Sequence, residues 1–543
     1  MNVARAIAKA MKAEGVDILF AYPVNPLIEA AAEEDIRTII VRQERTGLHM
    51  ADAYSRVTSG DKFGVFCMQH GPGSENAFGG VAQAFGESVP ILIVPSGYPR
   101  RLANYYPNFN SSLNMRNITK WAEPLTMAEA IPEVMRRVFS QLRNGRPGPV
   151  LLEVPADLWG AEVPDTWTHT RTFTAKSGPD PASVEEAARV LAAAERPVIY
   201  AGQGVHWSKA WDELKALATA WNIPVTTSIE GKSAFPEDHP FSLGSGGRAN
   251  PRPVKRFLAD ADVILGIGCS FALTGFGVQM PEGKTIIHAT LDPRDLNKDV
   301  EVQYALIGDA KLTLAALTQA MAGLDRSKAD ARRDVPEQIA ELREAWLAEW
   351  APRLTNDEAP INPYRVIAEL NAMVDKNRTI ITHDAGSPRD QMTPFWQSTA
   401  PLSYIGWGKT TQLGYGLGLA MGAKLAKPDH LCINVWGDAA IGFTGMDLET
   451  AARERIPILS ILLNNSSMAI EIPVMPVSQL KYGSTDISGN YADMARAFGC
   501  YAERITDPGE IAAALKRGID ATETGQPVLL EFITDKEIAT SLE

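Results

Sequence analysis

The sequence predicts an α/β protein built from three doubly wound parallel-sheet domains. Short apolar runs rich in β-branched residues alternate with amphipathic helical patterns along most of the chain. Such alternation is typical of parallel sheets with helices on both faces. At 543 residues the chain is too long for one core, and its length alone suggests about three or four domains. Two polar segments divide it into three blocks.

The first block, residues 1–165, begins with an amphipathic helix in which Val3, Ile7 and Met11 repeat on one face. Charged residues interrupt its apolar positions, so we expect neither a signal peptide nor a membrane span here. Five strands are predicted in this block: Asp17–Ala21, Thr38–Gln43, Gly64–Met68, Pro90–Pro95 and Pro149–Val154.

The second block, residues 185–322, follows a segment rich in Pro, Thr and Gly that reads as a linker, Trp159–Pro181. Its predicted strands are Pro197–Ala201, Val225–Thr227, Val263–Ile267 and Thr285–Ala289. The GQG run around Gln203 is a weak dinucleotide motif, because its third glycine is missing. Residues 323–360 are charged and helical, and we interpret them as a connector.

The third block, residues 361–543, includes the predicted strands Thr379–Thr382, Leu431–Trp436 and Ile458–Leu463. The chain has no tandem repeat, although three α/β blocks of similar size hint at ancient duplication.

Composition excludes some function classes. The net charge of −13 leaves no basic stripe for a nucleic-acid partner. The four cysteines are scattered without CxxC spacing, and three lie in strand-like apolar runs, as expected of reduced residues in a cytoplasmic protein.

One stretch of the third block, Gly437–Asn465, carries the strongest chemical signal. Gly437 and Asp438 form a turn after one strand, and Asn465 ends the next. A helix is predicted between the strands from the spacing of Phe443, Met446, Ala451, Ala452 and Ile456. The βαβ unit sets two oxygen ligands side by side where open α/β sheets bind ligands. With the N–H groups of Ala439 and Ala440, they suit Mg²⁺ bridging to a diphosphate.

This Gly-Asp turn, followed by twenty-odd residues and Asn-Asn, resembles the signature of thiamine diphosphate enzymes. The resemblance is to the branch with acetolactate synthase, pyruvate decarboxylase and oxalyl-CoA decarboxylase. Ala439 departs from the Gly of the commonest form, but it is also small. The resemblance covers nearly the whole chain in domain order. It implies a pyrimidine-binding domain at 1–165, a central domain at 185–322 and a diphosphate-binding domain at 361–543.

In this family, a Glu in the context of Glu44 hydrogen-bonds the aminopyrimidine ring and serves as the proton shuttle that activates the cofactor. On its own residue pattern, Glu44 would more often be a first-turn helix-dipole residue. Gly71, Pro72 and Gly73 resemble an acetolactate synthase turn that lets backbone approach the cofactor, and Asn76 follows it. His70 replaces a small hydroxyl residue, and it is either a proton relay or a hydrogen-bonded turn histidine.

Substrate residues are expected at two places in the first block. Asn25 stands where pyruvate decarboxylase-like enzymes carry a catalytic Asp, so it can orient a substrate carboxylate but cannot relay its proton. Phe109 and Asn110 lie roughly where acetolactate synthases place a Phe-Gln pair beside the acceptor substrate. The loop Asn104–Met115 contains no His, unlike the paired histidines of those decarboxylases.

The third block supplies the remaining implied contacts. Ser387 lies in a loop that the family uses to touch the diphosphate, and the alternative is an ordinary turn. The carbonyl of Thr411 would accept the 4′-amino hydrogen, and Leu413 would hold the cofactor bent, unless it is a core residue. The carbonyl of Ser467 would complete the Mg²⁺ shell with Asp438 and Asn465.

Glu471 has the same offset from Asn-Asn as the catalytic Glu of pyruvate and indolepyruvate decarboxylases, whereas acetolactate synthases have an apolar residue. The alternative is an exposed helix-start carboxylate. If Glu471 is buried, its pKa should rise, which would suit it to move a proton to or from an enamine intermediate.

The resemblance implies a thiamine diphosphate- and Mg²⁺-dependent enzyme that makes or breaks a C–C bond next to a carbonyl. We favour decarboxylation of a 2-oxo acid and ligation of the enamine to an acceptor, as in acetolactate synthase. Simple 2-oxo acid decarboxylation and the 2-hydroxyacyl-CoA lyase or oxalyl-CoA decarboxylase reactions are the alternatives. A non-catalytic, cofactor-binding regulatory homologue is the alternative of another class, which retention of Glu44 and the metal ligands disfavours.

The family also implies a homodimer or homotetramer with active sites at the subunit interface. Some acetolactate synthases bind FAD in a structural role. FAD stays an alternative here, because the middle block has no motif strong enough to show whether it binds FAD.

Overall fold

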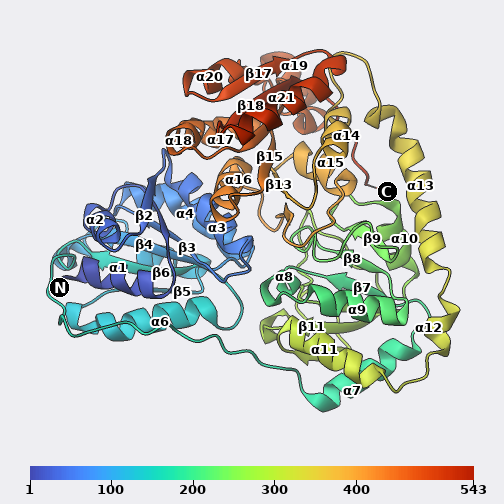
Figure 1. Cartoon of the computed structure of the whole chain (residues 1–543), viewed down its shortest axis with the longest axis horizontal. Coiled ribbons are helices and arrows are strands. Elements are labelled where there is room, and N and C mark those ends of the chain that lie inside the picture. The colour runs from blue at the N-terminus through green and yellow to red at the C-terminus, as the bar shows by residue number, and fades with distance from the viewer. Residues whose placement is uncertain (543) are drawn as a thin grey trace.

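Three six-stranded, all-parallel sheets make up the protein in the computed structural model, which describes residues 1–542. Helices lie between and around the sheets, and the three blocks are arranged as a triangle (Figure 1). These sheets confirm the predicted fold class. The domain limits 1–165, 185–322 and 361–543 stay predictions.

The first sheet has the order β2-β1-β3-β4-β6-β5. Its strands are β1 (Ile18–Ala21), β2 (Arg37–Ile40), β3 (Gly64–Met68), β4 (Ile91–Gly97), β5 (Trp121–Pro124) and β6 (Val150–Pro155). Its helices are α1 (Val3–Ala13), α2 (Asn25–Glu33), α3 (Glu44–Arg56), α4 (Pro72–Gly86), α5 (Ser111–Asn114) and α6 (Ile131–Arg143). Val3, Ile7 and Met11 of α1 are all buried, as their spacing predicts.

The second sheet has the order β12-β11-β10-β7-β8-β9. Its strands are β7 (Val198–Ala201), β8 (Val225–Thr227), β9 (Ser242–Ser245), β10 (Val263–Ile267), β11 (Thr285–Thr290) and β12 (Tyr304–Ile307). Its helices are α7 (Pro181–Ala193), α8 (Gly204–Ser208), α9 (Trp211–Trp221), α10 (Arg252–Asp260), α11 (Ala310–Met321) and α12 (Ser327–Ala331). The connector is α13 (Val335–Leu354), which runs along the edge of the molecule (Figure 1) and buries Ile339, Trp346 and Trp350.

The third sheet has the order β14-β13-β15-β16-β18-β17. Its strands are β13 (Thr379–His383), β14 (Tyr404–Ile405), β15 (Leu431–Gly437), β16 (Leu459–Asn464), β17 (Tyr501–Ile505) and β18 (Val528–Ile533). Its helices are α14 (Pro363–Met373), α15 (Ser387–Phe395), α16 (Tyr415–Ala426), α17 (Asp438–Thr444), α18 (Leu448–Glu454), α19 (Pro476–Tyr482), α20 (Tyr491–Ala497) and α21 (Ile511–Glu523).

The first and third sheets share one topology, since both read 2-1-3-4-6-5 when their strands are numbered in chain order. In this correspondence α3 and α16 each follow the second strand of their sheet. The two helices pack on each other where the first and third blocks meet (Figure 1). One continuous hydrophobic core includes buried side chains of both helices.

Close approach of α3 and α16 depends on glycine. A Cβ on Gly422 would lie 2.1 Å from the Met50 carbonyl oxygen, and one on Gly418 would lie 2.5 Å from the His49 Cβ. Polar groups also cross this contact, because the hydroxyl of Tyr415 donates to Asp52, which is paired with Arg56.

Two predicted elements are wrong in extent. The strand expected over Thr38–Gln43 ends at Ile40, because the chain leaves the sheet and the N–H of Arg42 donates to Asp447 of the third block, at 2.7 Å. The helix expected between β15 and β16 is broken into α17, a 3₁₀ turn η5 (Gly445–Asp447) and α18. Phe443 and Met446, predicted on its apolar face, are 47% and 51% exposed.

Candidate cofactor site

Asp438 and Asn465 lie side by side at the carboxyl edge of the third sheet. Asp438 is the first residue of α17, directly after β15, and Asn465 directly follows the adjacent strand β16. Both side chains accept the same backbone N–H, that of Ser467, at 3.1 Å from Asp438 Oδ2 and 3.0 Å from Asn465 Oδ1. The shared donor brings two side-chain oxygens together, as the motif predicts.

The first residue of the Asn-Asn pair has a different task. Asn464 is fully buried, donates to Glu531 at 2.7 Å and accepts the N–H of Ser466 at 3.0 Å. Ser466 has φ of +55°, so the chain bends sharply after β16. This bend lets Asn465 and Ser467 face the same cavity.

The electrostatics of Asp438 fit a cation. Its side chain is 4% exposed, and burial raises the pKa of Asp438 to about 6, although N–H groups of Ser467 and Ala439 partly offset this. A metal ion would stabilise the charged carboxylate that burial disfavours. Among residues 1–542 no group of three or more His, Cys, Asp or Glu could hold a metal. A site with one carboxylate, an amide and a carbonyl suits Mg²⁺, which keeps phosphate and water ligands.

A cavity of about 130 Å³ opens at these residues. It is lined by nine residues that the sequence predicts for the site, namely Ser387, Leu413, Gly437, Asp438, Ala439, Ala440, Asn465, Ser467 and Glu471. Glu471 lies in a 3₁₀ helix, η6 (Ala469–Val474), and is half-buried. The described chain therefore brings together most of the predicted diphosphate half-site.

Asp384 holds the turn that carries Leu413. This fully buried carboxylate follows β13 and accepts the N–H groups of Gly414 and Gly416, both at 2.9 Å, and that of Ala385 at 2.8 Å. Burial raises the pKa of Asp384 to about 6, and these three N–H groups act in the opposite direction. Gly414 has φ of +84°, a conformation that favours glycine, and α16 begins directly after it.

Thr411 precedes this turn and is not among the residues lining the cavity. Its neighbours are held by the first block: Thr410 donates its hydroxyl to Gln83, and the Gln412 side chain bonds to His49 at 3.0 Å. The position of Thr411 is therefore set by contacts on both sides of it.

The first block forms a second group of predicted residues. Glu44 is the first residue of α3 and 4% exposed, and it accepts a hydrogen bond from the Asn76 amide at 3.3 Å. A Cβ on Gly73 would lie 3.0 Å from Gln69 Cγ and 3.4 Å from Glu44 Oε1, so the backbone at Gly73 lies close to this carboxylate. Burial is the main cause of the raised pKa of Glu44, and the nearby Asp447 adds to it.

His70 and Asn25 lie at the carboxyl edge of the first sheet. His70 follows β3 and packs its ring on Tyr98, with ring centroids 4.5 Å apart. Asn25 is the first residue of α2, after β1, and is exposed. The structure shows neither one hydrogen-bonded to Glu44.

Phe109 and Asn110 precede the short helix α5. Phe109 packs against the core that joins the first and third blocks. Asn110 caps α5, because its side-chain oxygen accepts the N–H of Leu113 at 2.8 Å and the hydroxyl of Ser112 at 3.1 Å. A substrate contact by Asn110 would therefore have to come from its amide nitrogen.

No residue of the first block is among those lining the 130 Å³ cavity. Glu44 with its neighbours and Asp438 with its neighbours are thus two separate groups in one chain. The cavity of about 130 Å³ is also smaller than the roughly 300–1,000 Å³ of ordinary ligand sites.

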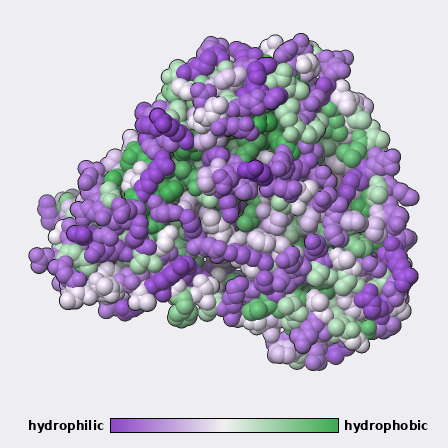
Figure 2. Space-filling view, viewed as in Figure 1, coloured by the Kyte–Doolittle hydropathy of each residue, from purple (hydrophilic) through white to green (hydrophobic). Residues whose placement is uncertain are grey.

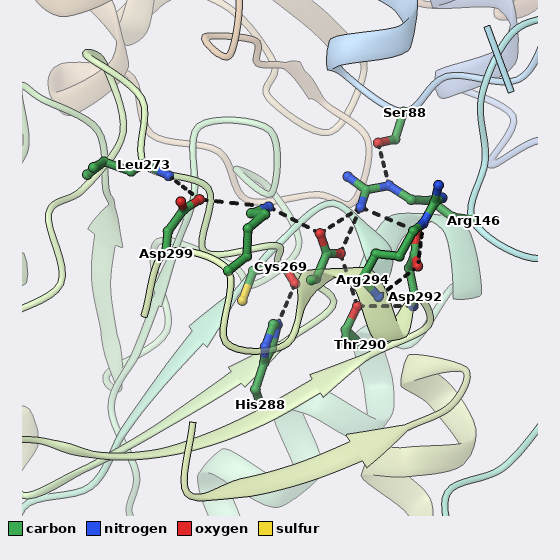
Figure 3. Close-up of polar contacts among 11 residues, drawn as sticks. Ser88, Arg146, Cys269, Leu273, His288, Thr290, Asp292, Arg294 and Asp299 are labelled. Atoms are coloured by element: carbon green, nitrogen blue, oxygen red, sulfur yellow. Dashed lines mark hydrogen bonds and ion pairs between the residues drawn. The ribbon is translucent and has the colours of Figure 1, made fainter. Parts of the chain in front are cut away.

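A larger cavity of about 540 Å³ lies between the first and second blocks and the segment at Lys409. Two of its lining groups pair with each other, since Arg146 contacts both oxygens of Asp295 at 2.8 Å. The lining residue Asp292 accepts a hydrogen bond from Arg294 at 2.7 Å (Figure 3). A diphosphate at Arg146 would have to compete with this carboxylate. The cavity gives no observation that singles out FAD.

Sequence reasoning missed Asp384 as a positioning residue. A faint signal was present, because a strand-terminal Asp before Gly386 and a glycine-rich turn thirty residues on suit a carboxylate that accepts backbone N–H groups. Tyr98, which covers His70, had no such signal.

Comparison with known proteins identifies three domains in the chain. Three family models match: the N-terminal TPP binding domain of thiamine pyrophosphate enzymes at residues 1–119, their central domain at 184–317, and their C-terminal TPP binding domain at 384–532. The fold and site thus define a thiamine pyrophosphate-dependent enzyme.

The chain also resembles individual relatives over its whole length. It is 31% identical to a probable acetolactate synthase large subunit of Methanococcus aeolicus, over 100% of this chain and 93% of the relative. It is 32% identical to a probable acetolactate synthase large subunit of Methanocaldococcus jannaschii, covering 98% and 92%. For acetolactate synthase isozyme 3 large subunit of Escherichia coli, identity is 25%, covering 98% and 95%.

The chain belongs to the thiamine pyrophosphate enzyme family, in its acetolactate synthase-like branch. This confirms the predicted family and the predicted enzyme class, a thiamine diphosphate-dependent carboligase or decarboxylase. In the described residues, no helix is long and apolar enough to cross a membrane.

Proposed function

We propose that this enzyme binds thiamine diphosphate with Mg²⁺, decarboxylates a 2-oxo acid and ligates the remaining acyl unit to an acceptor carbonyl, as an acetolactate synthase does. The convergence of Asp438 and Asn465 on the N–H of Ser467 is the observation that carries this proposal. Similarity to acetolactate synthase large subunits supports the ligation reaction.

The residues around the 130 Å³ cavity fit the cofactor. Asp438, Asn465 and the Ser467 carbonyl would hold Mg²⁺, while Ser387 and the N–H groups of Ala439 and Ala440 would bind the diphosphate. Leu413 would support the bend of the cofactor, with the Thr411 carbonyl beside it. When bound, the thiazolium ring supplies the electron sink for breaking a bond next to a carbonyl.

Glu44 would exchange a proton with the aminopyrimidine ring. Its buried position and its raised pKa suit a group that holds a proton and releases it during the reaction. Asn76, which bonds to Glu44, would fix the direction of the carboxyl group. Gly73 leaves room for a ring to approach.

A second copy of the chain would complete the site, in a homodimer or a homotetramer made of such dimers. The 130 Å³ cavity lacks any residue of the first block, although Glu44 is needed at the cofactor. Large apolar side chains are exposed beside both half-sites, including Phe78 on α4 and Val477, Leu480 and Tyr482 on α19. Figure 2 shows hydrophobic residues exposed near the junction of the first and third blocks.

Other residues would act on the substrate, which is a small molecule. His70, Asn25, Phe109 and the amide of Asn110 lie at the carboxyl edge of the first sheet, where they would face the reacting carbon in the partner's site. Glu471, at the mouth of the cavity, would move a proton after decarboxylation. Four buried thiols support a location in the reducing cytoplasm.

Simple decarboxylation is the second candidate, and Glu471 favours it. A carboxylate that protonates the reacting carbon would release an aldehyde instead of a ligated product. The experiment is reconstitution with thiamine diphosphate and Mg²⁺, with pyruvate, other 2-oxo acids and 2-hydroxyacyl-CoA esters as substrates, and mass analysis of products from wild type and Glu471→Gln.

Ligation is supported if a hydroxy-oxo acid forms and Glu471→Gln keeps the same product. Aldehyde release that Glu471→Gln reduces at least tenfold would favour the decarboxylase. A product that forms only from CoA esters would favour the lyase. If wild type binds the cofactor but turns over no substrate, the non-catalytic homologue becomes the better account.

A further inference from the structure

Residues 406–413 form an irregular segment that leads into the turn before α16. The segment has no helix or strand of its own, so its backbone polar groups need partners elsewhere. It ends at Leu413, which lines the 130 Å³ cavity, and it contains Thr411. Any shift of this segment would therefore move two residues proposed to contact the cofactor.

The N–H of Trp407 donates to His383 of β13 at 3.3 Å, and the other partners named below come from α3 and α4 of the first block. Arg56 donates to the Gly406 carbonyl at 2.9 Å, and Glu87 Oε1 accepts the N–H groups of Gly408 at 3.1 Å and Lys409 at 2.9 Å. Glu87 lies directly after the last residue of α4 and is fully buried.

Gln83, one turn earlier on α4, is 1% exposed and uses both ends of its amide. Its oxygen accepts the Thr410 hydroxyl and the N–H of Gln412, the latter at 3.3 Å. Its nitrogen donates to the Thr410 carbonyl and to Glu87 Oε1, both at 3.3 Å. Thr411 thus lies between two residues that Gln83 holds.

We infer that Gln83 and Glu87 are positioning residues of the active site, which fix segment 406–413 so that Thr411 and Leu413 meet the cofactor correctly. This inference rests on the proposed cofactor site. A displacement of about 1 Å in such a support is enough to lower a catalytic rate strongly.

The inference is specific to these two side chains. Glycine at 79 and 86 lets the segment approach α4, since a Cβ on Gly79 would lie 2.1 Å from Gln412 Nε2 and one on Gly86 would lie 3.2 Å from Thr410 Cγ2. The helix surface is therefore shaped for this segment, and Gln83 and Glu87 supply the polar contacts on it.

Four variants test the inference. Gln83→Met keeps the volume but removes every polar contact, and Glu87→Leu removes the acceptor for two N–H groups. Glu87→Gln keeps one oxygen in place and should restore the contacts. Glu14→Gln is the matched control, because Glu14 is an equally buried carboxylate whose partners Arg143, His169 and Thr172 lie in the first block and the linker.

The first readout is hydrogen exchange of residues 406–413 in the cofactor-free full-length protein. We expect exchange at least about tenfold faster in Gln83→Met and Glu87→Leu than in wild type, near-normal exchange in Glu87→Gln, and no change in Glu14→Gln. Wild-type exchange in both Gln83→Met and Glu87→Leu would overturn the inference, whatever the cofactor does.

The second readout is calorimetric binding of thiamine diphosphate with Mg²⁺, near-UV circular dichroism of the bound cofactor, and kinetics. We expect affinity and kcat to fall about tenfold or more in the two disruptive variants, with an altered dichroism band and little change in KM for substrate. Faster exchange together with wild-type binding, dichroism and kcat would overturn the positioning role. If wild type itself does not bind thiamine diphosphate, the proposed function is wrong. That result does not depend on the variants, so it can be told apart from a failure of the positioning role.

Discussion

At the residue scale, one backbone N–H organises the proposed metal site. The N–H of Ser467 donates to both Asp438 and Asn465. Rotation of either side chain would therefore break one of these two hydrogen bonds. Asn464, by contrast, is fixed by Glu531 and shapes the bend. Of the two adjacent asparagines, Asn464 therefore shapes the bend, and Asn465 is the one assigned to the proposed metal site.

We predict that Asp438→Asn weakens binding of thiamine diphosphate with Mg²⁺ by about 100-fold or more. The amide keeps one oxygen near Ser467 but removes the only negative charge that the protein would supply to Mg²⁺. Calorimetry at several Mg²⁺ concentrations measures the loss. Asp429→Asn, an exposed change in the same block, is the control. Equal binding by Asp438→Asn and wild type would contradict the assignment of the metal site.

Glu44→Gln is predicted to lower kcat by about 100- to 10,000-fold, the usual contribution of a positioned acid–base group. Glutamine can still bond to Asn76 and to a ring nitrogen, so cofactor affinity should change less than tenfold. Single-turnover rates and cofactor titration separate the two effects. Glu34→Gln, at the C-terminal end of α2 where Glu34 pairs with Arg5, should behave as wild type. A Glu44→Gln enzyme that keeps most of its turnover would remove Glu44 from catalysis.

At the element scale, the contact of α3 with α16 joins the first and third blocks. Gly422 allows it, because a Cβ there would lie 2.1 Å from the Met50 carbonyl oxygen, a backbone atom that cannot turn aside. We predict that Gly422→Ala lowers stability by about 1–3 kcal/mol through overpacking, seen as a lower thermal midpoint. Gly442→Ala in α17 is the matched control, since a Cβ there meets nothing within 4 Å. Equal thermal midpoints for the two variants would show that α3 and α16 can move apart to accept a Cβ at Gly422 without loss of stability.

Glu87 gives this region a pH dependence. Burial raises the pKa of Glu87 from the model-peptide range to about 7, with Glu230 adding to the effect and Lys409 and Arg56 opposing it. A carboxyl whose pKa is higher when folded stabilises the fold below its unfolded pKa, and this contribution is lost as pH rises towards 7. Wild type should therefore lose stability relative to Glu87→Gln between about pH 4.5 and pH 7.

Thermal midpoints of the two cofactor-free proteins across this pH range provide the measurement. Glu87 Oε2 has no hydrogen-bond partner among the described residues, so an amide nitrogen placed there breaks no existing hydrogen bond. A constant difference between the two midpoints would mean that Glu87 titrates as an exposed carboxyl does.

Local pattern explains what the sequence could predict. Most central strands are continuous apolar runs, and the Gly437–Asn465 motif lies within one βαβ unit, so both were predicted. The exception is β18, a central strand with the apolar sequence VLLEFI, which was not predicted. The edge strands β5 and β17 are short and contain charged residues such as Glu123 and Glu503, and β14 has only two residues, which gives no periodic signal. The break of the helix at η5 was missed for a similar reason.

The supporting residues could not be predicted, because their contacts are distant in sequence. Gln83 and Glu87 bond to residues more than 320 positions away, and Asp384 accepts N–H groups about thirty positions away. A single sequence carries no local trace of the pairs made by Gln83 and Glu87, and only the faint signal described above for Asp384. The sequence could predict the residues around Glu44 and those around Asp438 only as two separate groups. In the folded chain, no residue of the first block lines the cavity at Asp438.

At the scale of the whole molecule, the first and third sheets share one topology, and each carries one half of the proposed site. Each half lies at the carboxyl edge of its own sheet, where parallel sheets bind ligands. Helix α4 links them: its first turns lie beside Glu44, and its last turn holds segment 406–413. In a dimer, this helix would contact both active sites.

Mixing two inactive variants tests whether the halves combine between chains. Glu44→Gln supplies an intact diphosphate half, and Asp438→Asn supplies an intact Glu44. After unfolding together and refolding in equal amounts, half of the dimers should contain one of each, with one normal and one doubly defective site. If Glu44 acts across the interface, about one quarter of wild-type activity returns. If both halves serve within one chain, every site keeps one defect and no activity returns, because no exchange of partners can then unite Glu44 with Asp438. Refolded wild type corrects for yield, and mass measurement of the mixed dimer confirms that exchange took place.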